Sequence, residues 1–379
     1  MKTKRDIGIY CHVPFCIKKC AYCDFYSGCF YDLADRYIDA LLSEAAVYAK
    51  EYPDLSVSTL YFGGGTPSSL TKEQLIRLIG GIQRLFFVSH DAEITLEANP
   101  ATLDEDKLIA LKNAGVNRIS IGVQSADDNE LKTLSRLHSY NDFLSTYSLV
   151  KKYFENVSLD LMFGLPDQTV DRFEATLDRI LSLDPAHISL YALKIEEGTP
   201  FSKNQDKYAF PDEDTVSEMY IRAHDILEQY GYSQYEISNY AKQDSFSRHN
   251  LRYWEGKEYL GLGPAAHSYF NKARYANKPD IHQYIASLEA GEMPEKSELY
   301  TLKGEDFLEE AIILPLRLTK GLDTERLRTE HRYDILSVCK TKIEFYLKEG
   351  YMTLHEGVLA FTSKGFLVSN TILSELLPE

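Results

Sequence analysis

Six short apolar segments recur through the first half of the chain, and they limit its fold more than any other feature. They are typical of strands and lie at Gly8–Val13, Ser58–Phe62, Glu93–Glu97, Arg118–Val123, Ser158–Met162 and His187–Ala192. Stretches of helical periodicity separate them, at Leu33–Ala49, Lys72–Leu85, Leu103–Asn113, Phe143–Tyr153 and Arg172–Ser182. Alternating strands and helices predict an α/β fold with a parallel sheet and helical crossovers.

The ends of these strands favour a partial barrel of six β/α units over an open sheet. Each strand is followed at its carboxyl end by a distinctive polar or glycine-rich cluster. An open doubly wound sheet concentrates its ligand contacts at one switch point, whereas barrel enzymes build their sites from many strand ends. We therefore expect a ligand site at the carboxyl ends of the six strands.

The pattern divides the chain into three parts. Residues 1–230 contain the six units, and residues 231–299 form a connecting region rich in Tyr, Asn and Gly that resists classification. Residues 300–379 are expected to form a small domain of helices followed by a hairpin, which is typical of winged-helix modules. The hairpin is expected at Tyr351–Leu354 and Val358–Phe361, around a turn at Glu356-Gly357.

Charge and hydropathy exclude some classes of function. The formal net charge of −16 argues against electrostatic binding of nucleic acid over a broad surface, because such binding needs clustered Lys and Arg. No apolar run is long enough to span a bilayer. The N-terminal segment, Met1-Lys2-Thr3-Lys4-Arg5-Asp6, lacks the apolar stretch of a signal peptide, so we expect a cytoplasmic protein.

Three cysteines after the first strand point to a metal centre. Cys16, Cys20 and Cys23 have the spacing C-x3-C-x2-C, and short spacings within one loop are how iron–sulfur clusters are commonly held. A cubane cluster has four irons, so three cysteines leave one iron open to another ligand. Zinc with His12 as fourth ligand is the alternative, but structural zinc usually uses two separated ligand pairs.

The segment from Tyr10 to Phe25, which reads YCHVPFCIKKCAYCDF, resembles the radical SAM superfamily. Within it, the similarity is to oxygen-independent coproporphyrinogen III oxidase and to its close relatives, the HemW-type heme chaperones. The resemblance implies a partial (β/α)6 radical SAM barrel with a C-terminal helical, winged-helix-like domain. It also implies that the three cysteines hold a [4Fe–4S] cluster. S-adenosylmethionine (SAM) would then chelate the open iron, and an electron from the cluster would cleave SAM to a 5′-deoxyadenosyl radical.

The later strand ends fit the same register over about residues 8–200. A glycine run exposes backbone groups to a ligand, Glu97 can accept from ribose hydroxyls, and Asp160 lies in an apolar strand where an unpartnered charge is costly. Taken alone, such features also suit a tight turn, a solvated charge or, for Arg136, a helix surface. The SAM-site positions implied by the resemblance are Tyr10, Gly64, Gly65, Thr66, Glu97, Gln124, Arg136, Asp160 and Ala192.

Two functions from different classes compete. One is an enzyme that oxidatively decarboxylates coproporphyrinogen, and the other is a carrier that binds heme and hands it to acceptor proteins. The loop of the oxidase resembles C-x3-C-x2-C-x-C, but Phe25 occupies the last cysteine position here. The oxidase also carries a long N-terminal extension, whereas this chain begins nine residues before Tyr10. We therefore expect a chaperone of this fold without the oxidase activity.

A histidine in the connecting region carries the heme hypothesis. The stretch His249-Asn250-Leu251-Arg252-Tyr253 resembles the H-N-x-x-Y element assigned to heme binding in the chaperone family. An imidazole is a common axial haem ligand, and Arg248 and Arg252 can pair with propionates. The simpler interpretation is a surface-loop histidine flanked by solvated arginines.

The resemblance also suggests partners. Heme and heme-acceptor proteins, respiratory proteins among them, are the expected ones, and a respiratory acceptor implies peripheral membrane association. An exposed cluster loop can bring two chains together, so a cluster-dependent homodimer is a further expectation.

Overall fold

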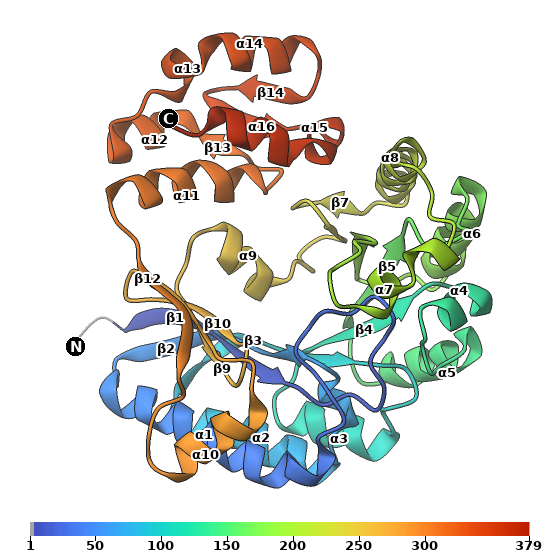
Figure 1. Cartoon of the computed structure of the whole chain (residues 1–379), viewed down its shortest axis with the longest axis vertical. Coiled ribbons are helices and arrows are strands. Elements are labelled where there is room, and N and C mark those ends of the chain that lie inside the picture. The colour runs from blue at the N-terminus through green and yellow to red at the C-terminus, as the bar shows by residue number, and fades with distance from the viewer. Residues whose placement is uncertain (1–3, 379) are drawn as a thin grey trace.

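The computed structural model describes residues 4–378 and shows one large sheet with helices along its outer side (Figure 1). Twelve strands lie in the order β12-β11-β10-β9-β1-β2-β3-β4-β5-β6-β8-β7. Residues 1–3, the start of the N-terminal segment discussed above, lie outside the described residues. No helix of the described part is long and apolar enough to cross a membrane.

The six expected strands form the centre of this sheet, and each pairs with the next in parallel. Their bounds are β1 Arg5–Val13, β2 Leu55–Gly64, β3 Phe87–Ala98, β4 Arg118–Gln124, β5 Asn156–Phe163 and β6 His187–Ala192. The expected α/β fold with a partial barrel is confirmed. All six carboxyl ends therefore face the same way.

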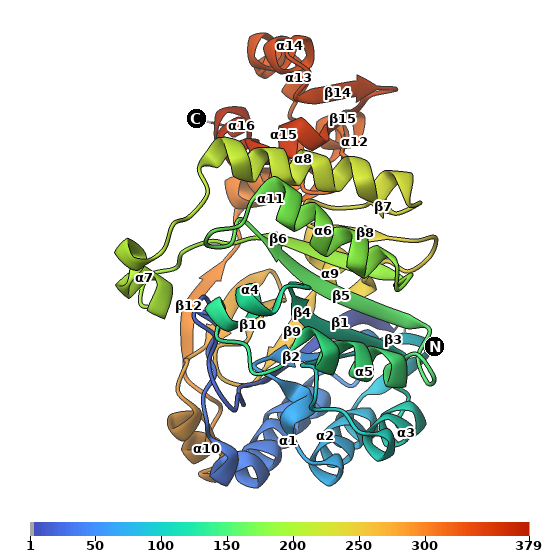
Figure 2. The same cartoon turned by 90° about the vertical axis from the view of Figure 1, so that its right-hand side faces the viewer.

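The five expected crossover helices are present. They are α1 Ala34–Glu51, α2 Lys72–Leu85, α3 Glu105–Asn113, α5 Tyr140–Val150 and α6 Val170–Leu181. A further helix, α4 at Asp128–Thr133, lies between β4 and α5. Helices α1, α2 and α3 cover the face of the sheet away from the C-terminal domain (Figure 2).

The two faces of the strands differ in polarity. On β1, Ile7, Ile9 and Cys11 are fully buried in the apolar core. Alternate residues point to the inside of the curved sheet, where Tyr10 and His12 lie. Polar side chains of β1 thus line the inside of the barrel.

Residues 231–299 extend the sheet at both edges. β7 (Ser233–Gln234) and β8 (Asn239–Ala241) continue it beyond β6, after helices α7 (Pro200–Lys203) and α8 (Glu213–Gln229). β9 (Tyr259–Leu262), parallel to β1, leads to β10 (His267–Phe270), β11 (Ala273–Asn277) and β12 (Lys296–Thr301), with α10 (Ile281–Glu289) before β12. Helix α9 (Arg248–Trp254) lies on the concave side, between the sheet and the last domain (Figure 1).

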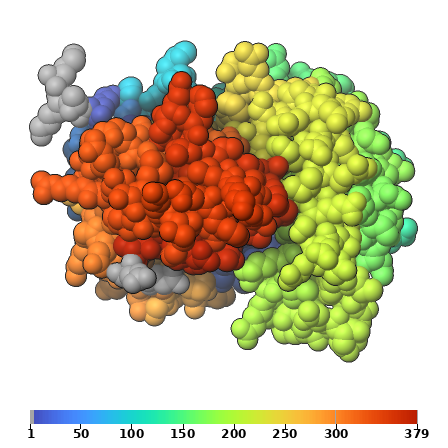
Figure 3. Space-filling model, turned by 90° about the horizontal axis from the view of Figure 1, so that it is seen from above, coloured from blue at the N-terminus to red at the C-terminus, as the bar shows by residue number. Residues whose placement is uncertain are grey.

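The C-terminal domain contains the expected helices and hairpin, but a third strand joins the hairpin and two helices follow it. Its elements are α11 Gly304–Leu316, β13 Leu322–Asp323, α12 Thr324–His331, α13 Ile335–Val338, α14 Lys340–Lys348, β14 Met352–His355, β15 Val358–Phe361, α15 Ser363–Leu367 and α16 Ser369–Leu376. Glu356 and Gly357 both have positive φ, which suits the expected tight hairpin turn. Seen from above, this domain lies beside α8 (Figure 3).

Candidate functional site

A cavity of about 400 Å³ opens at the carboxyl ends of the strands, beside the cysteine loop. Most of the thirteen residues that the sequence predicts for the site line it. These are Cys16, Cys20, Cys23, Gly64, Gly65, Thr66, Glu97, Gln124, Arg136 and Asp160. Residues from five separate units of the barrel therefore converge on one space.

The cysteine loop is irregular and is tied down at its base. The Cys16 N–H donates to the Gly28 carbonyl at 2.9 Å, and the Gly28 N–H donates to the Pro14 carbonyl at 2.9 Å. Burial, together with the neighbouring Cys20 and Cys16 sulfurs, raises the pKa of the Cys23 thiol to about 11. Three interacting sulfurs on one loop fit the donor set of an iron–sulfur cluster, whose positive charge stabilises the thiolates.

His12, the fourth ligand in the zinc alternative, has hydrogen-bond partners at both ring nitrogens. The Tyr26 carbonyl lies 2.8 Å from Nε2 of His12, so Nε2 carries the hydrogen, and Nδ1 accepts from the Tyr10 hydroxyl at 3.0 Å. Burial lowers the pKa of His12 to about 4. His12 instead positions Tyr10 and the end of the loop.

The glycine run packs against the His12 ring and against the backbone that leads into the cysteine loop. Gly64 has φ +113°, and a Cβ there would lie 2.5 Å from the His12 ring. Gly65 donates its N–H to the Val13 carbonyl at 2.9 Å, and a Cβ on it would lie 2.8 Å from the Phe15 carbonyl. The run is therefore a tight turn, and the same turn leaves backbone groups at the cavity wall.

Glu97 holds its carboxylate at the cavity with two donors. The Tyr61 hydroxyl donates to Oε1 at 2.8 Å, and the Gly64 N–H donates to Oε2 at 3.0 Å. Burial raises the pKa of Glu97 to about 7, and the nearby Asp160 acts in the same direction. The carboxyl group consequently changes charge near neutral pH.

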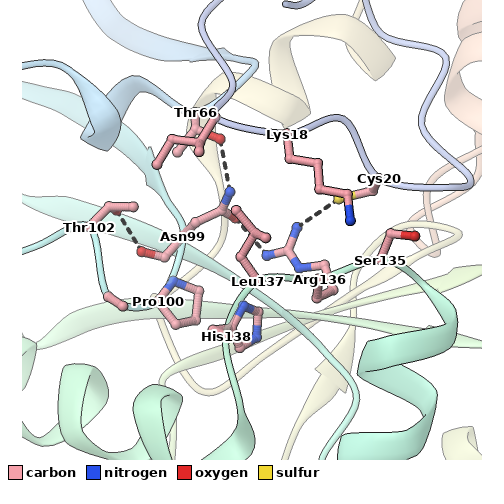
Figure 4. Close-up of a pocket in the computed structure, with 12 residues that line it drawn as sticks. Lys18, Cys20, Thr66, Asn99, Pro100, Thr102, Ser135, Arg136, Leu137 and His138 are labelled. Atoms are coloured by element: carbon pink, nitrogen blue, oxygen red, sulfur yellow. Dashed lines mark hydrogen bonds between the residues drawn. The ribbon is translucent and has the colours of Figure 1, made fainter. Parts of the chain in front are cut away.

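Arg136 lies in the loop between α4 and α5 rather than on a helix surface. Its Nη2 donates to Asn99 Oδ1 at 2.6 Å and to the Gly122 carbonyl at 2.5 Å, and its Nη1 contacts the Cys20 sulfur at 3.5 Å (Figure 4). Its Nε is buried without a partner. A buried unpartnered donor is costly, so this nitrogen can bind a ligand oxygen.

Two further predicted residues are positioned by the strands. Gln124 has φ +72° at the end of β4, where the register with β5 shifts, and such bulges re-aim side chains near sites. Asp160 accepts from the Ser120 hydroxyl at 3.1 Å, and burial raises the pKa of its carboxyl group. The Asp160 carboxyl group in the apolar strand therefore has Ser120 as a hydrogen-bond partner, and the buried Arg118 guanidinium lies nearby.

Three predicted residues lie outside the cavity lining. Tyr10 contacts His12, and Ala192 is exposed at the end of β6, where its neighbour Tyr191 lines the cavity instead. His249 is only 1% exposed on α9. The surface-loop interpretation of His249 is therefore wrong, while its role in heme binding stays a prediction.

Both ring nitrogens of His249 have partners. Nδ1 lies 2.8 Å from the Thr59 hydroxyl, and Nε2 lies 2.8 Å from the Tyr253 hydroxyl. The two flanking arginines are engaged as well: Arg252 Nη1 donates to an Asp6 carboxylate oxygen at 2.8 Å, and Arg248 Nη1 donates to the Asp91 carbonyl at 2.7 Å. Iron ligation by His249 would first require one of its hydrogen bonds to open.

Several lining residues were not predicted. Asn99 donates to the Thr66 hydroxyl at 2.8 Å and accepts from Arg136, so it links two strand ends. Its position two residues after Glu97 was the available signal. Tyr22 and Lys194 also line the cavity. Tyr22 lies inside the cysteine motif, whereas no pattern in the sequence marked Lys194.

Comparison with known proteins identifies relatives over the whole chain. The Radical SAM superfamily model matches residues 10–180, and the HemN C-terminal domain model matches residues 302–368. The heme chaperone HemW of Bacillus subtilis is 35% identical over 98% of this chain and 99% of its own. That of Escherichia coli K12 is 38% identical over 69% of each chain. Coproporphyrinogen III oxidase (HemN) from Escherichia coli superposes with a TM-score of 0.85 at 24% identity, over 99% of this chain and 90% of that one, which shows a shared fold.

Proposed function

This chain belongs to the HemW heme chaperone family of the radical SAM superfamily, and from that premise we propose that it binds heme and delivers it to acceptor proteins. The observation that carries the proposal is the 35% identity to a HemW protein over 98% of this chain and 99% of that one. The convergence of the predicted residues on one cavity supports it. A homodimer and peripheral membrane association remain expectations of the same proposal.

We propose that the cavity holds a [4Fe–4S] cluster and SAM. Cys16, Cys20 and Cys23 would hold the cluster, which when bound supplies one electron to SAM. Arg136 would offer its unpartnered Nε to the SAM carboxylate, and Glu97 would accept from the ribose hydroxyls. All of these residues line the cavity.

Heme carriage is tested directly by titration and transfer. Protein purified without oxygen and loaded with cluster should bind heme in a saturable manner, and it should pass that heme to an apo-haemoprotein faster than heme dissociates into buffer. Absorption spectroscopy follows both steps. A chain that binds no heme with its cluster intact would refute the proposal.

The oxidase is the competing function, and we expect no conversion of coproporphyrinogen III to protoporphyrinogen IX. Phe25 lines the cavity at the position where the oxidase carries a further cysteine, and its side chain cannot replace a thiolate. The assay supplies SAM and a reductant, with coproporphyrinogen III oxidase (HemN) as positive control. Turnover by this chain would restore the oxidase hypothesis.

His249→Ala should lower the free energy of unfolding by about 2–4 kcal/mol, because it removes buried ring volume and leaves Thr59 and Tyr253 hydroxyls without a partner. Tyr253→Phe, which removes one hydrogen bond, should cost about 1 kcal/mol. Denaturant titration measures both variants. A heme titration of His249→Ala then decides its ligand role, since an affinity equal to that of the unchanged chain would remove His249 from the heme site.

A further inference from the structure

One tyrosine contacts both the SAM side of the cavity and the H-N-x-x-Y helix. The hydroxyl of Tyr61 donates to Oε1 of Glu97 at 2.8 Å, and Glu97 is the carboxylate that we propose for the ribose. The ring of the same tyrosine stacks on the His249 ring, with 5.1 Å between the ring centroids and 30° between the ring planes. Tyr61 therefore connects two side chains that belong to two different proposed ligand sites.

Strand β2 places this tyrosine between the two sites. Thr59, two residues earlier and hence on the same face of the strand, has its hydroxyl 2.8 Å from Nδ1 of His249. Gly63, two residues later, leaves room for the contact with the carboxylate. A Cβ on Gly63 would lie 2.8 Å from both the Tyr61 ring and Oε1 of Glu97, so a larger residue there would push these two groups apart.

His249 has to leave its place beside Tyr61 before it can bind the iron of a heme. It is only 1% exposed, and both of its ring nitrogens have hydrogen-bond partners. A porphyrin is a flat ring several times wider than a phenol, and protein interiors are closely packed, so a shift of Tyr253 alone does not make room for it. The imidazole must therefore move outward, and the Tyr61 ring then loses the neighbour on which it stacks.

The loss of this neighbour acts on the SAM site through the Tyr61 hydroxyl. The hydrogen bond from Tyr61 favours the ionised form of Glu97 and so lowers the pKa of that carboxyl group, against the effect of burial. A ring that is free to turn maintains this hydrogen bond less well, so Glu97 is protonated more often and accepts less well from ribose hydroxyls. Conversely, bound SAM keeps Glu97 ionised and Tyr61 in place, which favours the buried position of His249.

We propose that SAM and heme weaken each other's binding to this chain, and that Tyr61 is the positioning residue that transmits the effect. The inference rests on the proposed heme-carrier function with His249 as iron ligand, and it adds a regulation of the heme site by the SAM site. Because the two binding free energies are linked, each ligand must weaken the other by the same factor. A carrier regulated in this way holds heme while the SAM site is empty and releases it when SAM binds.

The test is a heme titration at about pH 8, followed by absorption spectroscopy, of anaerobic cluster-loaded protein with and without saturating SAM. No reductant is added, so that SAM stays intact. Heme should bind about fivefold or more weakly with SAM present, and a SAM titration with and without heme should give the same factor.

Tyr61→Phe keeps the ring but removes the hydroxyl that donates to Glu97, so the factor should fall below about two. Tyr232→Phe is the matched control. Its hydroxyl is also buried and donates one hydrogen bond, to the Pro185 carbonyl at 2.6 Å, but Tyr232 lies outside the cavity lining. This variant should retain the full factor. Iron content and thermal melting verify that each variant is folded and loaded.

The outcomes separate the coupling from the function. An unchanged chain that binds no heme refutes the carrier proposal, and the coupling falls with it. Heme binding that depends on His249 but is unaffected or strengthened by SAM overturns the coupling alone. A factor that persists in Tyr61→Phe means that the two ligands compete for one space, and it excludes Tyr61 as the connection. The two titrations of the unchanged chain decide the sign and the reciprocity without any variant.

Discussion

A chain with Cys16, Cys20 and Cys23 all replaced by serine should contain almost no iron or sulfide after anaerobic reconstitution, where the unchanged chain should hold about four of each. The three sulfurs share one loop, and they interact strongly enough to affect the pKa of Cys23. Serine keeps the size of the side chain but removes the thiolate that binds iron. Single serine variants should lose most of the cluster as well, because two thiolates leave two irons without a protein ligand.

Cys29→Ser is the matched control, since Cys29 is an exposed free cysteine at the end of the same loop. It should retain the full iron and sulfide content. Loss of the cluster in this variant, or iron retained in the triple variant, would contradict the assignment. Zinc without sulfide in the unchanged chain would point to a structural metal instead.

The parts of the fold that follow local rules were predictable from the sequence. The helix expected at Lys72–Leu85 has those bounds in the structure, because Thr71 and Gln74 form a capping box at its start. The hairpin near Glu356-Gly357 follows from residues that accept positive φ. The hydrophobic periodicity and the capping residues determine where such elements begin and end, and both can be seen within a short stretch of sequence.

The extension of the sheet was not predictable in the same way. Strands β7 to β11 have two to five residues each, too few for a reliable alternation of polar and apolar positions. They are strands because β6 and β1 offer edges to pair with. Pairing with strands that are distant in the sequence determines the secondary structure of this region, and a short stretch of sequence does not show that pairing.

The histidines show the same limit at the level of single side chains. His249 sits in an exposed-looking polar stretch, yet the polar interior of the barrel offers Thr59 and Tyr253 to its ring, so it is buried. His138 is 7% exposed as well, and its surroundings combine segments more than thirty residues apart in the sequence. Burial inside a polar barrel cannot be read from hydropathy.

SAM should bind more tightly as the pH rises through about 7. The pKa of Glu97 is raised to about 7, chiefly by burial, so the carboxyl group is protonated below that pH and ionised above it. A ribose hydroxyl donates best to the ionised form. The dissociation constant should therefore increase by up to about tenfold for each pH unit below 7, and it should level off above. Anaerobic equilibrium dialysis of cluster-loaded protein with SAM measures this profile.

Glu97→Gln isolates the cause of this pH dependence. The amide cannot ionise. The Tyr61 hydroxyl and the Gly64 N–H donate to different oxygens of Glu97, so the NH₂ group of the amide must face one of these two donors. We expect at least tenfold weaker SAM binding at pH 8 and a flat profile between about pH 6 and 8. Glu196→Gln, at a lining carboxylate paired with Lys194 at 2.6 Å, should keep the slope. A slope that persists in Glu97→Gln would move the titration to Asp160, the other buried carboxyl group of this wall, because burial raises its pKa in the same direction.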